Sequence, residues 1–300
     1  MAKKKFYRPI LYGLAVFLRG FFSLLPFGAA FHFAGFMGRR AFYLIKKERA
    51  KTLAHLKIAF PERSEKELEK LGADVFQNYG YIAAELAFLD RRLKRFGEII
   101  TMQGREFLDE VVRQAKGGIV IVSHLGNWEY LGGYLAMLGY PCAVIGRRIY
   151  YDKYDQMLVG IRKKMKLRTI YRDESSREIL KELKEKKFVG FVVDQDVDTV
   201  DGVYAEFFGR PAYTPTAPIR LALRLGIPVV PVFIVRNGMK HHVIVEPLLD
   251  LVKTGDAEKD ILVNTQKWVS LQENYIRRYP HLWVWNHRRW KTPPPSSISV

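Results

Sequence analysis

Two short runs of entirely apolar residues most constrain how this 300-residue chain can fold. Residues 117–122 read GGIVIV and residues 188–193 read FVGFVV. A strand with one face in water alternates polar and apolar side chains, whereas a strand of a parallel sheet is buried on both faces and is apolar throughout. The two runs therefore predict central strands of a parallel sheet that helices cover on both faces.

Helical patterns alternate with these runs along the chain. Further strands are expected at about 142–145, 227–235 and 242–245, and helices at about 65–89, 127–139, 154–166, 176–187, 217–225 and 259–279. The alternation predicts an α/β fold with a mostly parallel or mixed central sheet flanked by helices. No linker interrupts residues 52–291, which we interpret as one catalytic domain. Residues 292–300, with three prolines and two serines in a row, are expected to be a disordered tail.

The first 51 residues differ from the rest in charge and hydropathy. The whole chain has 49 Lys and Arg against 31 Asp and Glu, a net charge of +18, and residues 1–51 hold eleven of the basic residues and a single acid, Glu48. Their basic side chains surround apolar stretches, a pattern that favours anionic lipid over nucleic acid. Residues 1–51 are therefore expected to be a membrane anchor. It would span the bilayer or lie in one leaflet, and the alternative is a helix pair packed on the domain.

Several common chemistries have no sequence signature here. The only cysteine is Cys142, so no intrachain disulfide can form. The chain has no phosphate-binding loop, dinucleotide fingerprint, nucleophile elbow or zinc-protease motif. Asp194, Asp196 and Asp198 alternate as in a calcium loop, but Thr199 stands where such a loop needs glycine. We expect no metal and no cofactor.

His124 and Glu129 follow the first apolar run, in the segment SHLGNWE. In open α/β sheets, functional sites lie at the carboxyl ends of the strands. Five residues of α-helix turn the chain by about 500°, so these two side chains can meet only if the chain bends between them. Gly126 permits a bend and Asn127 is a favourable N-cap residue. We expect His124 to be a general base whose other ring nitrogen is hydrogen-bonded by Glu129.

The H-x₄-E spacing is a weak signal by itself, because it occurs a second time in the chain. His241 and Glu246 have this spacing within HHVIVE. That segment is expected to be a strand, in which an odd spacing places two side chains on opposite faces. His124, with a strand before it and a helix start after it, is the better candidate.

Several blocks of sequence resemble, in order, the bacterial lipid A biosynthesis acyltransferases, within the wider lysophospholipid acyltransferase group. The blocks are AFPERS, SHLGNWE, Arg147 after a strand, VDQDVDTVDGVYAEFFGRPAYTPTAPIRLAL, GIPVVPVF and WVWNHRRWK. They extend over residues 50–291. Matching the family's catalytic histidine and acid to this chain gives His124 and Glu129.

The resemblance implies a glycerol-phosphate-acyltransferase-like α/β fold at the inner membrane, with the catalytic domain facing the cytoplasm. It implies transfer of a fatty acyl chain from acyl carrier protein, or alternatively from acyl-CoA, to a hydroxyl of a membrane glycolipid such as a lipid A precursor. The chain has Pro280-His281-Leu282-Trp283 where the family commonly has Pro-Glu-Gln-Trp. That departure leaves the acceptor open.

Five further residues are expected to bind substrate. Arg147 and Arg148 suit a phosphate of the donor or of the acceptor, because guanidinium groups form forked hydrogen bonds with phosphate. Asn127 opens a helix, and either a backbone N–H at that helix start or Arg147 is expected to stabilise the oxyanion. Asp194 and Gln195 follow the second apolar run and are expected to have a structural role or to orient the acceptor.

Two other classes of function remain open at this stage. The first is a membrane-associated, metal-dependent glycosyltransferase that uses Asp194 and Asp196 as a D-x-D motif. The second is a basic peripheral protein without catalytic activity. Neither a helix-turn-helix nor an RNA-binding signature is present, so nucleic acid is not an expected partner. The basic segment from Arg162 to Lys166 is a candidate contact for an acidic carrier protein or, alternatively, a solvated helix face.

Overall fold

The computed structural model describes residues 25–172 and 175–295, together with residues 9, 13 and 20. These residues form a seven-stranded sheet in the order β1-β9-β8-β2-β5-β3-β4. The strands are β1 (Ile100–Gln103), β2 (Gly118–Val122), β3 (Cys142–Gly146), β4 (Arg168–Tyr171), β5 (Phe188–Val192), β8 (Val229–Asn237) and β9 (Lys240–Val245). Only β8 and β9 pair antiparallel. The mostly parallel sheet is confirmed, and the two apolar runs form its neighbouring strands β2 and β5.

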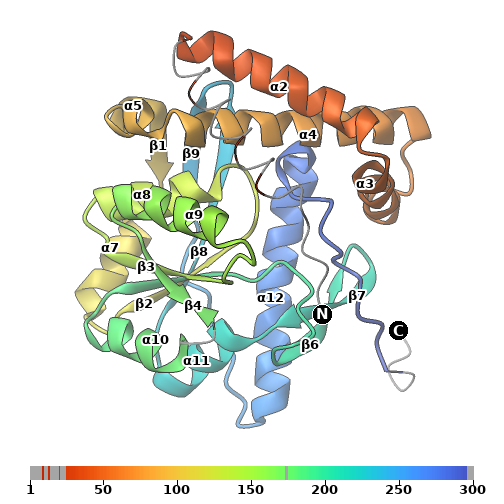
Figure 1. The fold of residues 1–300 in the computed structure, drawn as a ribbon. Coiled ribbons are helices and arrows are strands. Elements are labelled where there is room, and N and C mark those ends of the chain that lie inside the picture. The colour runs from red at the N-terminus through yellow and green to blue at the C-terminus, as the bar shows by residue number, and fades with distance from the viewer. Residues whose placement is uncertain (1–8, 10–12, 14–19, 21–24, 173–174, 296–300) are drawn as a thin grey trace.

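Helices cover both faces of the sheet, as Figure 1 shows. Because side chains alternate along a strand, Ile119 and Ile121 of β2 belong to one apolar core and Val120 and Val122 to the other. One face carries α7 (Arg105–Gln114), α8 (Trp128–Met137) and α9 (Asp152–Lys164), and the other carries α10 (Ser175–Lys184), α11 (Ala217–Leu225) and α12 (Ala257–Arg278). Both faces of the central strands are thereby removed from water.

The N-terminal helices form a separate layer against one end of the sheet. They are α2 (Phe27–Leu44), α3 (Lys46–Ala59), α4 (Glu65–Ala87), α5 (Leu89–Leu93) and α6 (Phe96–Ile99). The capping box at Ser64 and Glu67 begins α4, as the sequence predicts. Helices α2 and α4 run side by side (Figure 1) and approach closely through glycines. A Cβ atom on Gly38 would lie 2.2 Å from the Phe76 carbonyl oxygen, and one on Gly80 would lie 2.0 Å from that of Ala34.

Only part of the expected anchor lies within the described residues. Within 25–51, α2 and α3 pack on the domain, with Phe31 and Phe42 of α2 buried. In the described part of the chain, no helix combines the length and the hydropathy that crossing a bilayer requires. Most of residues 1–24 lie outside the described residues, so the anchor as a whole stays a prediction.

A β-hairpin and the C-terminal segment complete the domain beside α12. Strands β6 (Gly202–Phe207) and β7 (Arg210–Pro215) pair antiparallel outside the main sheet. After α12, the 3-10 turn η2 (Pro280–Leu282) leads into a segment whose Trp283 and Trp285 are fully buried. Of the expected tail, Thr292 hydrogen-bonds Asp196 and the Pro293 carbonyl accepts from Tyr204 Oη, while residues 296–300 lie outside the described residues.

Candidate active site

A cavity of about 650 Å³ opens at the carboxyl ends of β2, β3 and β5. This is the edge of the sheet at which ligands bind in open α/β folds. Its wall is largely apolar and includes side chains from β2, α8, β3 and β5 and from the loop before β4: Val120, Val122, Leu131, Leu135, Val144, Leu167 and Phe191. His124, Glu129, Arg147 and Gln195 also line it. Four of the seven residues that the sequence analysis expects in the site therefore line one cavity.

The register of the sheet brings His124 next to Asp194. Val122 of β2 is paired with Val192 of β5, and each of these polar residues stands two positions beyond its strand. His124 Nδ1 lies 2.5 Å from Asp194 Oδ1, and the His124 backbone N–H donates to Oδ2 at 2.6 Å. Of the two roles that the sequence leaves open for Asp194, structural or acceptor-orienting, the structure shows a contact of the first kind: Asp194 is the hydrogen-bond partner of His124.

The surroundings of Asp194 keep its carboxylate charged. Its side chain is 1% exposed, and Trp283 Nε1–H also donates to Oδ2 at 2.8 Å. Burial raises the pKa of the Asp194 carboxyl, but the neighbouring His124 and the three N–H donors outweigh it and hold the pKa at about 2. A charged carboxylate can only accept, so the hydrogen bond places a proton on His124 Nδ1, and in the neutral tautomer of the ring Nε2 is then the nitrogen with a lone pair. The His124 side chain is 18% exposed, on the cavity.

The bend after His124 forms as the sequence predicts. Gly126 has φ +61°, and a Cβ atom there would lie 2.2 Å from the Ile234 carbonyl oxygen. Asn127 Oδ1 accepts a hydrogen bond from the Tyr130 N–H at 3.1 Å, which caps α8. Asn127 is fully buried, and its Nδ2 donates to Glu85 at 2.8 Å. The Asn127 side chain is thus engaged within the protein, and the expected contact with substrate through backbone N–H groups at this helix start stays a prediction.

The expected hydrogen bond between Glu129 and His124 is not the one that forms. Both carboxylate oxygens of Glu129 accept from Arg162 of α9, at 2.8 Å from Nε and 2.7 Å from Nη2. The two side chains are 6% and 11% exposed and both line the cavity. Such a bidentate pair fixes the geometry of both partners. Arg162, expected on a carrier-binding or solvated surface, instead belongs to the wall of the site.

Gln195 and a second histidine complete the surroundings of His124. Gln195 Nε2 lies 3.3 Å from each ring nitrogen of His124 and 3.0 Å from His287 Nε2. Burial and the proximity of His124 lower the pKa of His287 to about 4, so His287 is a neutral hydrogen-bond acceptor. The Trp128 ring packs edge-on against His124, with 4.9 Å between centroids. His124 is thus fixed on three sides and open toward the cavity.

The two adjacent arginines predicted to bind phosphate point to different places. Arg147 lines the cavity. Arg148 is not among the lining residues, and its guanidinium lies 3.9 Å from the centre of the Tyr171 ring. Burial raises the pKa of Asp155, and the charge of Arg148 is one of the contributions that lower it on balance. Of these two arginines, only Arg147 is placed to contact a ligand in the cavity that holds His124.

Cys142 is the one thiol of the chain and also lines the cavity. Burial raises its pKa to about 12, which keeps it a neutral thiol. Its Sγ–H donates to the Tyr140 carbonyl oxygen at 3.2 Å. Since only the thiolate is a good nucleophile, the arrangement favours direct attack by a bound hydroxyl over a covalent enzyme intermediate.

The D-x-D alternative is not supported by the carboxylates it needs. Asp194 accepts three N–H donors, as described above. Asp196 Oδ2 accepts from the backbone N–H groups of Lys291 at 2.9 Å and Thr292 at 2.7 Å, and Oδ1 accepts from the Thr292 hydroxyl. Both carboxylates are thus engaged by donors from the C-terminal segment rather than directed together at a shared metal position.

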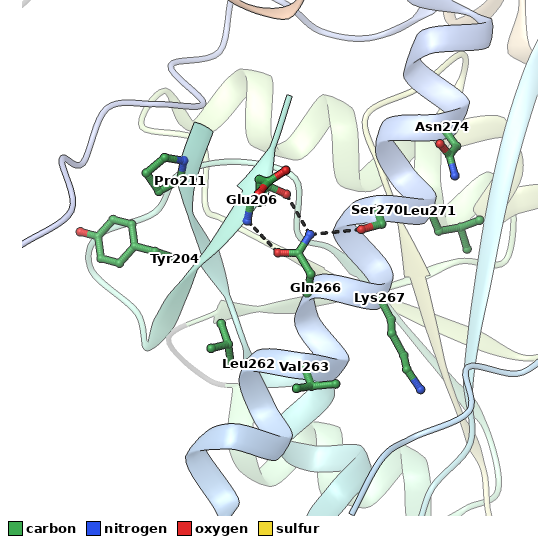
Figure 2. Close-up of a pocket in the computed structure, with 10 residues that line it drawn as sticks. All are labelled: Tyr204, Glu206, Pro211, Leu262, Val263, Gln266, Lys267, Ser270, Leu271 and Asn274. Carbon is green, nitrogen blue, oxygen red and sulfur yellow. Dashed lines mark hydrogen bonds between the residues drawn. The ribbon is translucent and has the colours of Figure 1, made fainter. Parts of the chain in front are cut away.

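A second and larger hollow lies on the surface between β6 and α12. Figure 2 shows Gln266 of α12 tied to the Glu206 backbone, with hydrogen bonds of 2.7 Å and 2.9 Å, and to Ser270 at 3.1 Å. Its volume is about 830 Å³, but no histidine or cysteine lines it. The smaller cavity at His124 is therefore the candidate active site.

Together, these features define a class of fold and site: an α/β domain in which a histidine, hydrogen-bonded by a buried carboxylate, faces a largely apolar cavity at the carboxyl ends of the strands. Comparison with known proteins identifies the family. The sequence profile described as bacterial lipid A biosynthesis acyltransferase matches residues 2–292. The chain therefore belongs to this family of acyltransferases, and the resemblance seen in its motifs is confirmed.

Relatives with assigned functions agree with this membership. The lipid A biosynthesis lauroyltransferase of Escherichia coli K12 is 26% identical over 282 residues, covering 90% of this chain and 88% of that protein. The E. coli lipid A biosynthesis myristoyltransferase is 24% identical over 266 residues, covering 87% and 81%. A phosphatidylinositol mannoside acyltransferase of Mycobacterium tuberculosis is 24% identical over 191 residues, covering 62% and 58%.

Proposed function

We propose that this protein transfers a fatty acyl chain from an acyl thioester to a hydroxyl of a membrane glycolipid, with His124 as general base. The observation that carries the proposal is the fixed orientation of His124: Nδ1 is held by the buried carboxylate of Asp194, and the ring faces an apolar cavity. Family membership and the names of the relatives support the same reaction.

The proposed reaction is a direct transfer. The acceptor hydroxyl gives its proton to His124 Nε2 while its oxygen attacks the thioester carbonyl carbon, and Asp194 stabilises the imidazolium that forms. The first turn of α8 begins at Trp128 in the cavity wall, so its N-terminal dipole favours the negative charge on the carbonyl oxygen. The C–S bond then breaks, and the leaving thiolate takes the proton from His124.

We propose that Glu129 acts through Arg162. The charge of Arg162 is fixed in the wall by its two hydrogen bonds to Glu129. Paired in this way, the arginine adds no uncompensated charge to a cavity that must accept an acyl chain. Glu129 thus remains part of the proposed catalytic machinery, as a residue that shapes the wall beside His124 rather than as the direct partner of the base.

The chemistry of the cavity fits an acyl donor. The apolar side chains of β2 and α8 below His124, including Val120 and Leu135, offer the hydrocarbon chain an environment without unsatisfied polar groups. We propose acyl carrier protein as the donor, with acyl-CoA as the alternative, and a lipid A precursor or related glycolipid as the acceptor. Gln195, next to His124, is proposed to contact the acceptor.

The outer face of α2 is proposed to rest on the cytoplasmic face of the inner membrane. Phe33, Phe36, Met37 and Leu44 are each 47–76% exposed and lie on one side of the helix. Arg40 stands among them, with its guanidinium 5.2 Å from the centre of the Phe36 ring. An apolar stripe flanked by basic residues is typical of helices that lie in the interface of anionic membranes. Contact there would bring the site close to its lipid acceptor.

The experiment that tests the function is acyl transfer from labelled acyl carrier protein to a panel of lipid acceptors in detergent, with EDTA present. Wild type and His124→Ala are compared side by side, and circular dichroism verifies their folding. We expect transfer by wild type and a loss of about 10²–10⁴ in rate for His124→Ala, because a general base contributes about that much.

Equal turnover by both proteins would mean that His124 is structural and would end the proposed mechanism. Absence of product from both with every carrier-linked donor would direct the same assay to acyl-CoA. In this assay Glu129→Gln is expected to reduce turnover less than His124→Ala does, because it loosens Arg162 without removing the base.

A further inference from the structure

Two arginines stand side by side where β3 and β4 end. The strands pair parallel, and their last matched residues are Gly146 and Tyr171. The next residue of each strand is an arginine: Arg147 after β3 and Arg172 after β4. Neighbouring strands lie about 4.8 Å apart, so the two backbones present their arginines at one edge of the sheet. Both side chains are exposed and line the cavity that holds His124.

These two guanidinium groups differ from the other arginines around them. Arg162 is paired with Glu129, Arg168 with Glu178 and Glu182, and Arg148 lies on the Tyr171 ring. Within residues 25–172 and 175–295, neither Arg147 nor Arg172 has a hydrogen bond or an ion pair. Two neighbouring like charges repel each other. That cost is removed when an anion binds between them.

We propose that Arg147 and Arg172 form a phosphate-binding subsite at the rim of the cavity. A phosphate group suits this pair because its tetrahedral oxygens accept forked hydrogen bonds from two guanidinium groups at once. In this subsite Arg172, rather than Arg148, is the partner of Arg147. The identity of the phosphate rests on the proposed function, which offers two sources. They are the prosthetic arm of the donor and the headgroup of the glycolipid acceptor.

The binding itself can be tested without acyl transfer. The thermal unfolding midpoint of the full chain in detergent is measured over a titration of inorganic phosphate, with sodium chloride at matched ionic strength as the reference. Ligand that binds the folded state raises the midpoint. Wild type and Arg148→Gln should respond alike, because Arg148→Gln removes one charge from the same loop outside the cavity. Arg147→Gln and Arg172→Gln should each weaken phosphate binding about tenfold, and the double variant should not respond.

A wild type that does not respond, or a double variant that responds as wild type does, would overturn the subsite. Neither outcome bears on whether the protein transfers acyl chains, which the His124 experiment decides. Failure of the subsite and failure of the proposed function are therefore distinguishable.

The source of the phosphate is assigned by paired substrates. One arm compares acyl-phosphopantetheine with acyl-pantetheine as donor, and the other compares a glycolipid acceptor with its dephosphorylated form. In the arm that carries the bound phosphate, wild type and Arg148→Gln should prefer the phosphorylated substrate at least tenfold in kcat/KM. In the double variant this preference should fall to near one. An undiminished preference of the double variant in both arms would exclude a role of the subsite in the reaction.

Discussion

In the described part of the chain, two histidines are each hydrogen-bonded to a buried carboxylate, and the two pairs differ in what else the carboxylate binds. Asp194 Oδ1 lies 2.5 Å from His124 Nδ1, and Glu85 Oε1 lies 2.8 Å from His241 Nε2. Burial raises both carboxyl pKa values, and in both cases the histidine and further N–H donors outweigh it and hold the pKa at about 2. The hydrogen-bond partner alone therefore does not make a histidine a catalytic base.

Charge balance separates the two pairs. Glu85 also accepts two hydrogen bonds from Arg236, at 2.6 Å and 2.7 Å, so its charge is already neutralised. A proton on His241 would add a net positive charge to a site in which the side chains of both the histidine and the glutamate are 0% exposed. Asp194 has no such arginine among its hydrogen-bond donors, so a proton on His124 completes a neutral pair. The two pairs therefore differ in whether an arginine already balances the charge of the carboxylate.

The two regions are connected through Asn127. Glu85 accepts a hydrogen bond from Asn127, the residue that caps α8 directly after the bend at Gly126. Arg236 in turn lies 5.5 Å from the Phe31 ring of α2 and 5.4 Å from the Tyr81 ring of α4. The pair of Glu85 and His241, which we call the closed pair because Arg236 already balances its charge, thus holds the loop that carries His124 against the N-terminal helical layer. We expect this pair to position the loop, so that its removal lowers the free energy of unfolding first.

The largest expected effect is on turnover by Asp194→Asn. Oδ2 accepts from the His124 backbone N–H and from Trp283 Nε1–H, which can only donate. The asparagine oxygen must take that position, so its NH₂ group faces His124 Nδ1 and the ring proton moves to Nε2, the nitrogen that must accept. We expect kcat to fall by about 10²–10⁴, as for loss of a general base.

Acyl-transfer assays and urea unfolding of Asp194→Asn and Asp201→Asn would measure this effect. Asp201→Asn removes an exposed charge seven residues further along the same loop and is the matched control. If Asp194→Asn kept more than a tenth of the turnover, the pair of His124 and Asp194 would not be the catalytic one, and the comparison between the two pairs would fail.

Glu85→Gln should have its main effect on stability. Every group that contacts this carboxylate donates: Arg236 with two N–H groups, His241 with Nε2 and Asn127 with Nδ2. An amide nitrogen in place of one oxygen would face a donor and leave Arg236 buried without a counter-charge. Breaking such a buried pair costs about 3–5 kcal/mol.

Urea denaturation should reveal this loss, whereas Glu98→Gln should change stability by less than about 1 kcal/mol, because Glu98 pairs with Arg95 on the surface. Turnover per folded molecule should change far less for Glu85→Gln than for Asp194→Asn. An equal loss of turnover in both variants would show that the two pairs work as one unit.

The sequence predicted the local features of the site and missed the long-range ones. The strand before His124, the bend at Gly126 and the cap at Asn127 depend on residues close together in the chain, and the structure confirms them. The contact between His124 and Asp194 joins residues 70 positions apart. It depends on β2 and β5 being neighbours, and strand order cannot be read from apolar periodicity. Had that order been known, the equal offset of both residues from their strands would have predicted the pair.

The same limit explains Glu129 and the arginines. A bend between His124 and Glu129 makes a direct hydrogen bond the simplest interpretation of their spacing. Helix α9 supplies Arg162 from 33 residues further on, and the arginine occupies the carboxylate completely. Arg172 could not be grouped with Arg147 before β4 was known to follow β3 in the sheet. Tertiary neighbours, rather than the motif itself, decide which groups meet.

The smallest expected effect tests the charge balance at the closed pair directly. The pKa of His241 lies below the usual 6.5. Burial lowers this pKa most, Glu85 raises it, and the charges of Arg236 and Arg92 lower it further. At pH values between that lowered pKa and 6.5, the unfolded chain binds a proton on this histidine and the folded chain does not. The free energy of unfolding therefore decreases as the pH falls through this range. In His241→Gln the free energy of unfolding should fall less between pH 7.5 and pH 5.5, by about 1 kcal/mol. The carboxyl groups of Asp194 and Glu85 do not contribute in this range, because their pKa values are held at about 2.

His242→Gln is the control, since His242 is adjacent on β9 and hydrogen-bonds Thr101 and Gln103 instead. Chemical denaturation at both pH values measures the difference between the variants. A pH dependence in His241→Gln as steep as in wild type would mean that His241 does not hold off a proton in the folded state. Both histidines would then be paired with carboxylates that accept their charge, and only access to the cavity would distinguish His124, the proposed base, from His241.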